Sequence, residues 1–259
     1  MKFTDKQIKE LIEAIFEGSI TSGNLPEDLY FAIADHIKEG LYDGFGGGLD
    51  SFEFGGKDYE LLNDLRTNVY LFSGAKTFQQ VSEMQSLIAD APNFKAFRDE
   101  VMKVYEKYNV DWLKAEYNTA IGQAKSASIW SDIEQDKELF PYLRYSSVMD
   151  SNTSDICRPL NGIVAPVDAA IWNKYSPLNH FNCRCLLEKI DKYENVKPTG
   201  KARVNEVTKQ MDDKVADEFK MNAGKDGYIF SPKHPYFEVA PKDKAFAKRN
   251  FDLPIPKKD

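Results

Sequence analysis

The chain has 259 residues, of which 42% are hydrophobic and 29% charged. This composition is typical of a folded globular protein and excludes an intrinsically disordered chain. No apolar run approaches the roughly 18–20 residues that span a bilayer, so we expect no membrane association through a spanning helix. The N-terminus, MKFTDKQIKELIEAIF, is charged and lacks the apolar core of a signal peptide, which predicts a protein made and kept in a cytoplasm.

The net charge of −7 argues against a free-standing DNA-binding protein. The charge is unevenly placed, because residues 196–259 hold 14 lysines and arginines against 10 acidic residues, while the rest holds 20 against 31. Such a contrast indicates either separate partners or a basic tail that is simply solvated. If the tail meets DNA, its small positive excess predicts weak, salt-sensitive contact without sequence preference.

Apolar periodicity predicts a helical region over residues 1–130. Thr4 is a suitable N-cap for its first helix, and Pro26 stands where a first-turn proline opens the second. The last helix of this region is rich in alanine, a strong helix former. The expected helices are Asp5–Phe16, Pro26–Tyr42, Asp58–Ser73, Lys76–Ala89, Phe94–Tyr108 and Asp111–Trp130.

A glycine-rich stretch, Asp43–Gly56, separates two of these helices. It lacks the Gly-Lys-Ser/Thr ending of a phosphate-binding loop and the glycine spacing of a dinucleotide-binding turn. We therefore interpret it as a flexible or tightly turning connection.

The pattern changes after Pro141, where residues 131–195 predict a small α+β module. Short apolar and aromatic runs indicate three strands, the second of which follows an Asn-Gly turn. The expected elements are strands at Tyr142–Met149, Leu160–Val164 and Cys183–Ile190, and a short helix at Val167–Tyr175.

Residues 196–259 predict a linker, a helix at Asn205–Met221 and an extended basic tail. The tail contains prolines and aromatic residues but little periodicity, so we expect it to pack on another surface, such as a neighbouring subunit. The predicted fold class is thus α+β, with a predominantly helical N-terminal region, a small three-stranded α+β module and an extended C-terminal tail.

The three cysteines and one histidine of the α+β module form the most informative cluster. An odd number of cysteines in a cytoplasmic chain argues against a disulfide framework. Three thiolates and an imidazole suit one tetrahedral zinc ion, and four protein ligands leave no open position, so the ion would be structural. The candidate metal ligands are Cys157, His180, Cys183 and Cys185.

A second interpretation of the same residues is that they are buried thiols without a metal. Cysteine is among the most buried residue types even when it binds nothing. The Cys-x2-Cys arrangement of many zinc sites is also missing on the side of Cys157. The spacing alone leaves both interpretations open.

The order of residues in this segment carries more information than the cysteines do. Along the chain come Arg144 in an aromatic strand, Asp150, Thr153, Cys157, Leu160-Asn161-Gly162, Trp172, Pro177, His180 and Cys183-Arg184-Cys185. This string resembles the Mu F-like family of phage minor head, or head morphogenesis, proteins. The resemblance covers Trp112–Ile190, and one departure is that Arg158 and Pro159 stand where many members carry a second cysteine.

The resemblance implies a non-enzymatic protein of the phage or prophage head. It would be present in few copies, in the head interior or portal region of the virion and in the host cytoplasm during assembly. It would contact portal, major capsid or scaffold proteins and act in head or procapsid assembly and in genome packaging or delivery. No catalytic residue, small-molecule substrate or cofactor other than one structural zinc is expected.

Three enzymatic interpretations compete with this one. Cys157 or Cys183 could act as a nucleophile with His180, but no third group that orients the histidine stands out. A zinc deaminase lacks support because the His-x-Glu element is absent. A metal nuclease could use Asp150, Asp155 and His180, although turn capping is the simpler role for the aspartates.

A further alternative is an effector or toxin with nuclease-like activity in its C-terminal part, since Mu F-like modules resemble ones joined to such domains. The segment Ser231–Phe237 contains Lys233, His234 and Tyr236, for which a general-base or phosphate-binding role is conceivable. We favour the interpretation that His234 and Pro235 belong to a loop that packs aromatic side chains.

Overall fold

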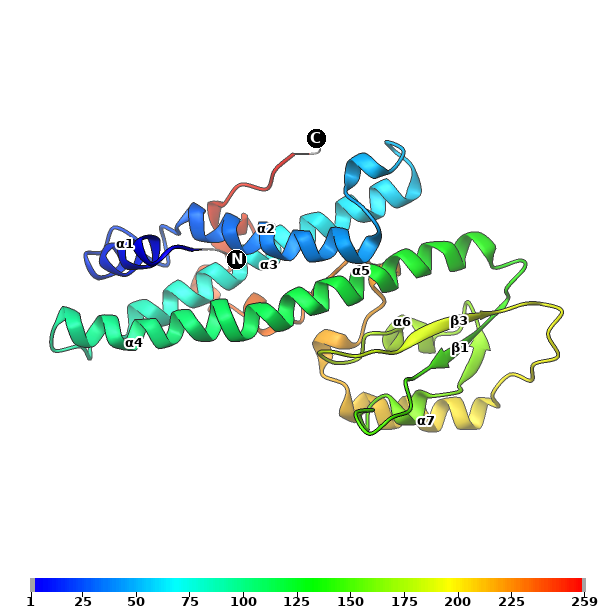
Figure 1. Cartoon of the computed structure of the whole chain (residues 1–259). Helices are drawn as coiled ribbons and strands as arrows, with labels where there is room; N and C mark the ends of the chain where they lie inside the picture. Colours follow the sequence, from blue (N-terminus) through cyan, green and yellow to red (C-terminus); the bar gives the residue numbers. More distant parts are fainter. Residues whose placement is uncertain (1–2, 258–259) are drawn as a thin grey trace. The chain divides into compact units, whose positions relative to one another are not determined.

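The structure, a computed structural model, describes residues 3–257 (Figure 1). The predicted fold class is confirmed, since a helical N-terminal region is followed by a three-stranded antiparallel sheet and a tail of short turns. The longer helices are α1 (Asp5–Phe16), α2 (Glu27–Phe45), α3 (Lys57–Ser86), α4 (Phe94–Glu106), α5 (Leu113–Asp136) and α7 (Lys201–Lys214). The strands and shorter helices are β1 (Tyr142–Ser146), β2 (Val164–Pro166), α6 (Ile171–Tyr175), β3 (Leu186–Ile190), α8 (Ala223–Asp226) and α9 (Lys244–Ala247).

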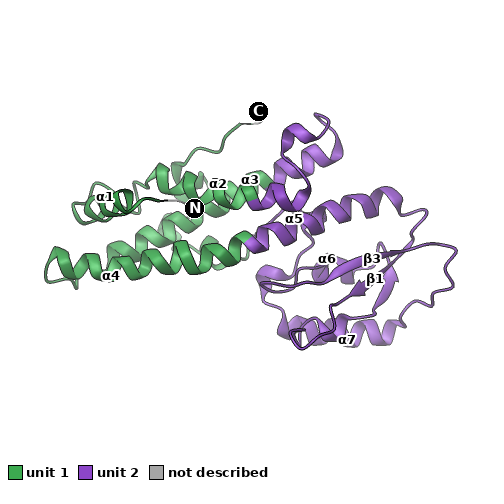
Figure 2. Cartoon of the chain, in the orientation of Figure 1, with its two compact units in different colours: residues 1–39, 66–117, 233–259 green, residues 40–65, 118–232 purple. Residues whose placement is uncertain are grey.

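The chain divides into two compact units (Figure 2). Unit 1 contains residues 1–39, 66–117 and 233–259, and unit 2 contains residues 40–65 and 118–232. Neither unit is a continuous piece of chain. Each is therefore closed by contacts between segments that lie far apart in the sequence. In residues 3–257, no helix contains a stretch long and apolar enough to cross a membrane.

The first helix of unit 1 begins where the sequence predicts. The hydroxyl of Thr4 accepts a hydrogen bond from the backbone N–H of Gln7, whose side-chain oxygen accepts the N–H of Thr4. These two bonds form a capping box, which satisfies backbone donors that a helix start leaves free. Leu11, Ile12 and Ile15 of α1 are buried, as their spacing predicts.

Helix α3 corrects one prediction, because it runs without a break through the two helices expected at Asp58–Ser73 and Lys76–Ala89. Gly74 lies inside the helix rather than between two helices. A Cβ atom at Gly74 would collide with the side-chain oxygen of Asn250. The glycine is thus explained by close packing of the C-terminal segment, which a local pattern does not reveal.

The C-terminal segment, described over residues 233–257, belongs to unit 1 and packs on the same chain rather than extending away from it. The ring of Phe251 stacks on Phe78 of α3, with the centroids 4.6 Å apart. The hydroxyl of Tyr30 on α2 donates to the carbonyl of Pro254 over 2.8 Å. The tail therefore packs on a surface, as predicted. In the described residues, that surface belongs to the same chain and not to a neighbouring subunit.

A buried ion pair lies within unit 1. The Nζ of Lys76 is 2.9 and 2.7 Å from the two carboxylate oxygens of Glu116 and donates to the carbonyl of Tyr108 over 2.6 Å. Both side chains are almost fully buried. Burial lowers the pKa of Lys76 and raises that of Glu116, and their mutual attraction opposes both shifts. The hydroxyl of Tyr236 donates to Glu116 over 2.9 Å and joins the C-terminal segment to the pair.

Replacing one member of this ion pair should lower the free energy of unfolding more than replacing both members. In Lys76→Met the Glu116 carboxylate loses its cation inside the protein, and we expect a loss of about 3–5 kcal/mol in the free energy of unfolding. The double variant Lys76→Met/Glu116→Leu should lose less, because no charge remains buried. Urea denaturation followed by circular dichroism measures both.

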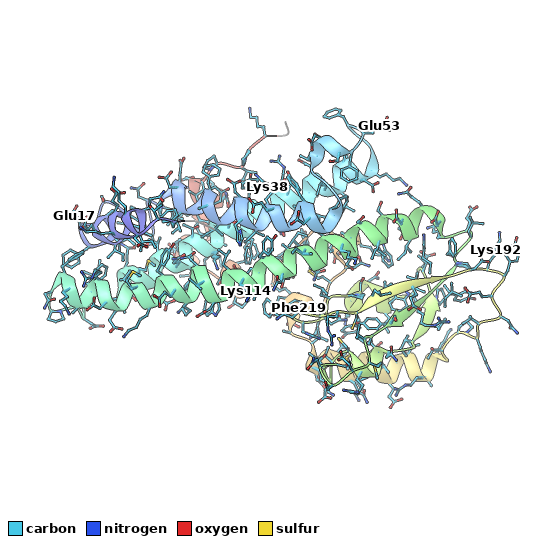
Figure 3. The ribbon with its side chains drawn as sticks, viewed as in Figure 1. Glu17, Lys38, Glu53, Lys114, Lys192 and Phe219 are labelled. Atoms are coloured by element: carbon cyan, nitrogen blue, oxygen red, sulfur yellow. The ribbon has the colours of Figure 1, made fainter. Side chains whose placement is uncertain are left out.

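Lys38→Met is the matched control for this comparison. Lys38, labelled in Figure 3, forms a partly exposed pair with Asp35 at 2.7 Å. Such a pair contributes about 1 kcal/mol or less. A double variant that is as unstable as Lys76→Met would show that the two buried charges are not coupled.

The sheet of unit 2 has the strand order β2-β1-β3, with β1 antiparallel to both neighbours. Tyr145 of β1 lies opposite Leu187 of β3, and both are buried. Arg144 lies opposite Glu188, and these two form an ion pair at 3.2 Å. One face of the sheet is therefore apolar and the other charged, as expected for an antiparallel sheet with one covered face.

Helices of unit 2 supply the rest of its core. Trp130 and Ile133 of α5, Trp172 of α6 and Val207 and Met211 of α7 join the buried strand residues in one cluster. Helix α7 begins at Lys201 and ends at Lys214, earlier than the predicted Asn205–Met221. Its end is explained by Val215, which takes up extended backbone and is buried.

The glycine-rich stretch between α2 and α3 is a tightly turning connection, as predicted. Helix α2 continues to Phe45, so the stretch begins inside it. Gly46, Gly47 and Gly55 then adopt positive φ angles of 102°, 154° and 76°. Residues with side chains rarely adopt these angles, which accounts for the glycines.

Candidate metal centre

Two segments converge at the end of the sheet. Ser146, the last residue of β1, lies opposite Leu186, the first residue of β3. Antiparallel pairing therefore places the residues that follow β1 beside those that precede β3. The turn that leads to Cys157 and the loop that carries His180 and Cys183 meet there.

The turn after β1 is shaped by its own polar side chains. The carboxylate of Asp150 accepts the N–H of Asn152, and the hydroxyl of Thr153 accepts the N–H of Asp150, each over 2.9 Å. Ser154 accepts the N–H of Cys157 over 3.1 Å. Short polar side chains commonly fold turns in this way. The predicted turn-capping role of Asp150 is thus confirmed, and Asp155 is exposed.

The loop before β3 is anchored on the core. The amide of Asn179 donates to the hydroxyl of the buried Tyr145 over 2.8 Å. The ring edge of Phe181 meets Phe219, labelled in Figure 3, with the centroids 4.9 Å apart. A Cβ atom at Gly122 of α5 would lie 2.5 Å from the side chain of Leu178, so only glycine lets the helix approach the loop this closely.

The structure brings three of the four predicted ligands together. The Sγ of Cys157 is 3.2 Å from Nε2 of His180 and 3.6 Å from the Sγ of Cys183. In residues 3–257 these three form the group of ligand atoms that lie within 4.8 Å of one another. Cys185 is not a member of this group, and its thiol is 3.4 Å from the hydroxyl of Ser147.

A small void relates Cys185 to the other ligands. It has a volume of about 20 Å³, and Cys157, His180 and Cys185 all line it. A space of this size holds one water molecule or ion. Three of the four predicted ligands thus line one void, and the fourth, Cys183, contacts Cys157.

The proton position on His180 suits a metal ligand. Its Nδ1 is 2.7 Å from the carbonyl oxygen of Phe181, which can only accept, so Nδ1 carries the proton. Nε2 is left with a lone pair that faces Cys157 and, at 2.8 Å, the hydroxyl of Ser154. A backbone carbonyl that orients the distal nitrogen is common behind metal-bound histidines.

The thiols and the imidazole influence one another electrostatically. The hydrogen bond with Cys183 raises the pKa of His180 and outweighs burial. The hydrogen bond with Cys183 lowers the pKa of Cys157, but a hydrogen bond with Cys185 and burial outweigh it, so the pKa of Cys157 is raised overall. Without a cation, the Cys157 thiol is therefore protonated at neutral pH, and a metal would displace its proton.

Arg184, between the two cysteines of the Cys-Arg-Cys motif, connects the two segments. Its guanidinium donates to both carboxylate oxygens of Asp150 over 2.9 and 2.7 Å. Bidentate pairs of this kind fix orientation as well as distance. The contact with Arg184 holds the pKa of Asp150 at about 2.

Several residues that shape the centre escape the sequence analysis. Ser154 lies in a recognisable polar turn, but its proximity to His180 depends on the fold. Asn179 and the carbonyl of Phe181 give no signal in the sequence. The Phe181 carbonyl is also the orienting group that the nucleophile interpretation lacks. Cys157 is 2% exposed, however, which shields its sulfur from a substrate.

The C-terminal histidine is a packing residue of unit 1. The ring of His234 is 5.0 Å from Phe72 and 4.6 Å from Tyr236, measured between centroids. Its Nδ1 accepts the N–H of Tyr236 over 3.2 Å. Burial lowers the pKa of His234 to about 4. The prediction that this loop packs aromatic side chains is confirmed.

The sheet, the preceding helix and the Cys-Arg-Cys motif lie in a segment that is similar to a class of phage proteins. Residues 74–188 match the family described as Phage Mu protein F like protein. This confirms the resemblance predicted from the motif string and extends it back into α3. No solved structure matches the chain.

A particular relative is the protein named "Putative capsid assembly protein F" of Escherichia phage Mu. It is 30% identical to this chain over 74 residues, which cover 29% of the chain and 17% of the relative. The chain therefore matches about a sixth of the length of this relative.

Removing the arginine should release the Asp150 carboxyl. In Arg184→Met we expect the pKa of Asp150 to rise from about 2 towards its ordinary value of 3.8. Because the folded-state pKa is the lower one, the pair stabilises the fold above about pH 4, and this contribution is lost as the pH falls towards 2. Carboxyl carbon shifts followed by NMR during a pH titration measure the change.

Arg203→Met is the control for this titration, since Arg203 forms a similarly exposed pair with Glu206 on α7. It should leave the titration of Asp150 unchanged. If Asp150 still titrates near 2 in Arg184→Met, the guanidinium is not the cause of the shift.

Proposed function

We propose that this chain acts in phage head assembly as a minor head protein. The observation that carries the proposal is the ordered motif string inside residues 74–188, the segment that is similar to the Mu F-like family. The printed name of the Mu relative, a putative capsid assembly protein, supports the same role. The partners we propose are portal, major capsid or scaffold proteins, with a role in genome packaging or delivery.

The proposed location is the host cytoplasm during assembly and then the head interior or portal region of the virion. We further propose that the chain is not an enzyme. Two features support this: the sulfur of Cys157 is buried, and the carboxylate of Asp150 is engaged by Arg184. Both groups therefore serve to hold the module together.

We propose that the centre holds one structural zinc ion bound by Cys157, His180, Cys183 and Cys185. The donor set supports this, because thiolates and a neutral imidazole suit zinc. The lone pair on Nε2 of His180 and the void lined by Cys185 add to the support. When bound, the ion would supply a cross-link between the turn after β1 and the loop before β3.

We also propose weak contact with DNA through the C-terminal tail. The tail packs on unit 1, yet Lys242, Lys244 and Lys248 remain exposed. A few exposed cations support non-specific contact with phosphates that weakens steeply as salt rises.

Zinc binding gives a measurable stoichiometry. Protein purified without chelators should contain about one zinc per chain, as four-ligand structural sites do. His180→Ala should lose most of this zinc and should melt at a lower temperature, because the metal contributes to folding. Elemental analysis and thermal unfolding measure the two effects.

His36→Ala is the matched control, since His36 lies on α2 and stacks on Tyr117. It should keep the zinc content of the parent protein. The absence of zinc from the parent, or equal content in His180→Ala, would leave the interpretation of buried thiols without metal.

The head-assembly role predicts that the chain is a particle component. Heads or procapsids purified from a producing host should contain it alongside the portal protein, as detected by mass spectrometry. Deleting its gene should reduce the yield of infectious particles at least tenfold, and the parent gene or His36→Ala should restore the yield. Purified particles that lack the chain, or a deletion without effect, would count against the role.

A further inference from the structure

The two sulfurs of Cys157 and Cys183 lie in contact although their residues are far apart in the sequence. Their Sγ atoms are 3.6 Å apart, and both thiols are free in this structure. Cys157 comes from the turn after β1, and Cys183 from the loop before β3. A covalent bond between them would join the same two segments that the proposed metal ion joins.

Access to the pair is asymmetric. A cavity of about 200 Å³ opens between α5 and the loop, lined by Gly122, Lys125 and Ser126 on the helix side and by Cys183 and Cys185 on the other. Cys157 is not among the residues that line it and is 2% exposed. Cys183, which is 9% exposed, therefore borders this cavity together with Cys185, whereas Cys157 borders the separate small void beside His180.

We propose that Cys157 and Cys183 are a redox-active pair that a peroxide converts into a disulfide. Peroxide in the cavity first oxidises the Cys183 thiol, which lines it, to a sulfenic acid and is reduced to water. The proton of Cys157 passes to Nε2 of His180, 3.2 Å away, and the thiolate attacks the sulfenic sulfur. The S–O bond breaks, and the leaving hydroxide takes the proton from Nε2 of His180 to form a second water. Two thiols and one peroxide thus give one disulfide and two waters.

Cys185 is the competing partner for Cys183. Its thiol hydrogen-bonds to Ser147, whose hydroxyl donates to the carbonyl of Cys157. A Cys183–Cys185 bond would also have to close across a single intervening residue. Two residues this close in the chain meet the narrow geometry of a disulfide less readily than two segments whose sulfurs already lie 3.6 Å apart. The geometry therefore favours the bond to Cys157.

If Cys157, His180, Cys183 and Cys185 held the zinc ion proposed above, its two thiolates from Cys157 and Cys183 would be open to the same oxidation. The peroxide would then take up their two electrons and two protons from solvent to give two waters, and the disulfide would remove two of the four ligands. The setting rests on the proposed head function: a virion component passes from a reducing cytoplasm to an oxidising exterior. There the disulfide would replace the metal as the link between the segments.

Peptide mapping of the full chain after treatment with hydrogen peroxide tests the proposal. Digestion without reductant should yield a peptide pair joined through Cys157 and Cys183, which separates again on adding dithiothreitol. Cys185→Ser, which removes the competing thiol, should still form this bond. Cys183→Ser should not form it.

The peptide map of the parent protein is sufficient to test the proposal, so the test does not depend on whether a variant folds. A Cys183–Cys185 bond, bonds only between chains, or three thiols still open to alkylation would overturn the proposal. A zinc-sensitive dye, added in parallel, measures the zinc that the protein holds or releases. This measurement separates the hypothesis of a zinc site from the hypothesis of a redox-active thiol pair. A disulfide in protein that never held zinc would refute the metal site and support the thiol pair, whereas retained zinc without a disulfide would do the reverse.

Discussion

The α+β module depends on the contact between the turn after β1 and the loop before β3. The register of these strands sets the two segments side by side, because Ser146 lies opposite Leu186. Cys157 and Cys183 then meet at 3.6 Å, and Arg184 holds Asp150 from outside the sulfur cluster. The strands are short, so side-chain contacts beyond their ends must hold the segments that the ladder leaves unpaired.

In unit 1, side-chain contacts also hold together segments that are far apart in the sequence. Its C-terminal segment returns over a long stretch of chain, and the entropy lost on closing so long a loop must be offset by the contacts that the segment makes. Aromatic stacking of Phe251 on Phe78 supplies apolar contact, and Tyr236 supplies a hydrogen bond to the buried Glu116. A charge pair in an apolar interior adds little stability by itself but penalises every arrangement that separates it. The hydrogen bond from Tyr236 thus ties the tail to the carboxylate of this buried pair.

Local patterns in the sequence predict the parts of the structure that local physics determines. The first helix, its Thr4 cap and the alternation of buried and exposed residues in β1 follow from periodicity and capping. The unbroken α3 does not follow from them. The predicted break between Ser73 and Lys76 falls at Gly74, and the reason for this glycine is its packing against Asn250, which depends on the fold. The tail illustrates the same limit, since prolines and scattered aromatic residues carry no period that reveals which helices they meet.

The candidate centre likewise has features that the sequence predicts and features that depend on the fold. Spacing and residue type single out four candidate ligands, because few side chains other than cysteine and histidine bind zinc. The contacts that fix their protonation and access come from groups whose roles depend on the fold, such as the Phe181 carbonyl and the cavity beside α5. These contacts also explain why one geometry suits both a metal and a disulfide. The pKa of Cys157 is raised in the absence of a cation, so its thiol is mostly protonated at neutral pH. A cation would gain affinity as the pH rises and the Cys157 thiol loses its proton. A peroxide needs only one accessible sulfur and a second within reach. Under the two proposals above, the surroundings of the protein, rather than a rearrangement of its fold, would decide which link joins the two segments.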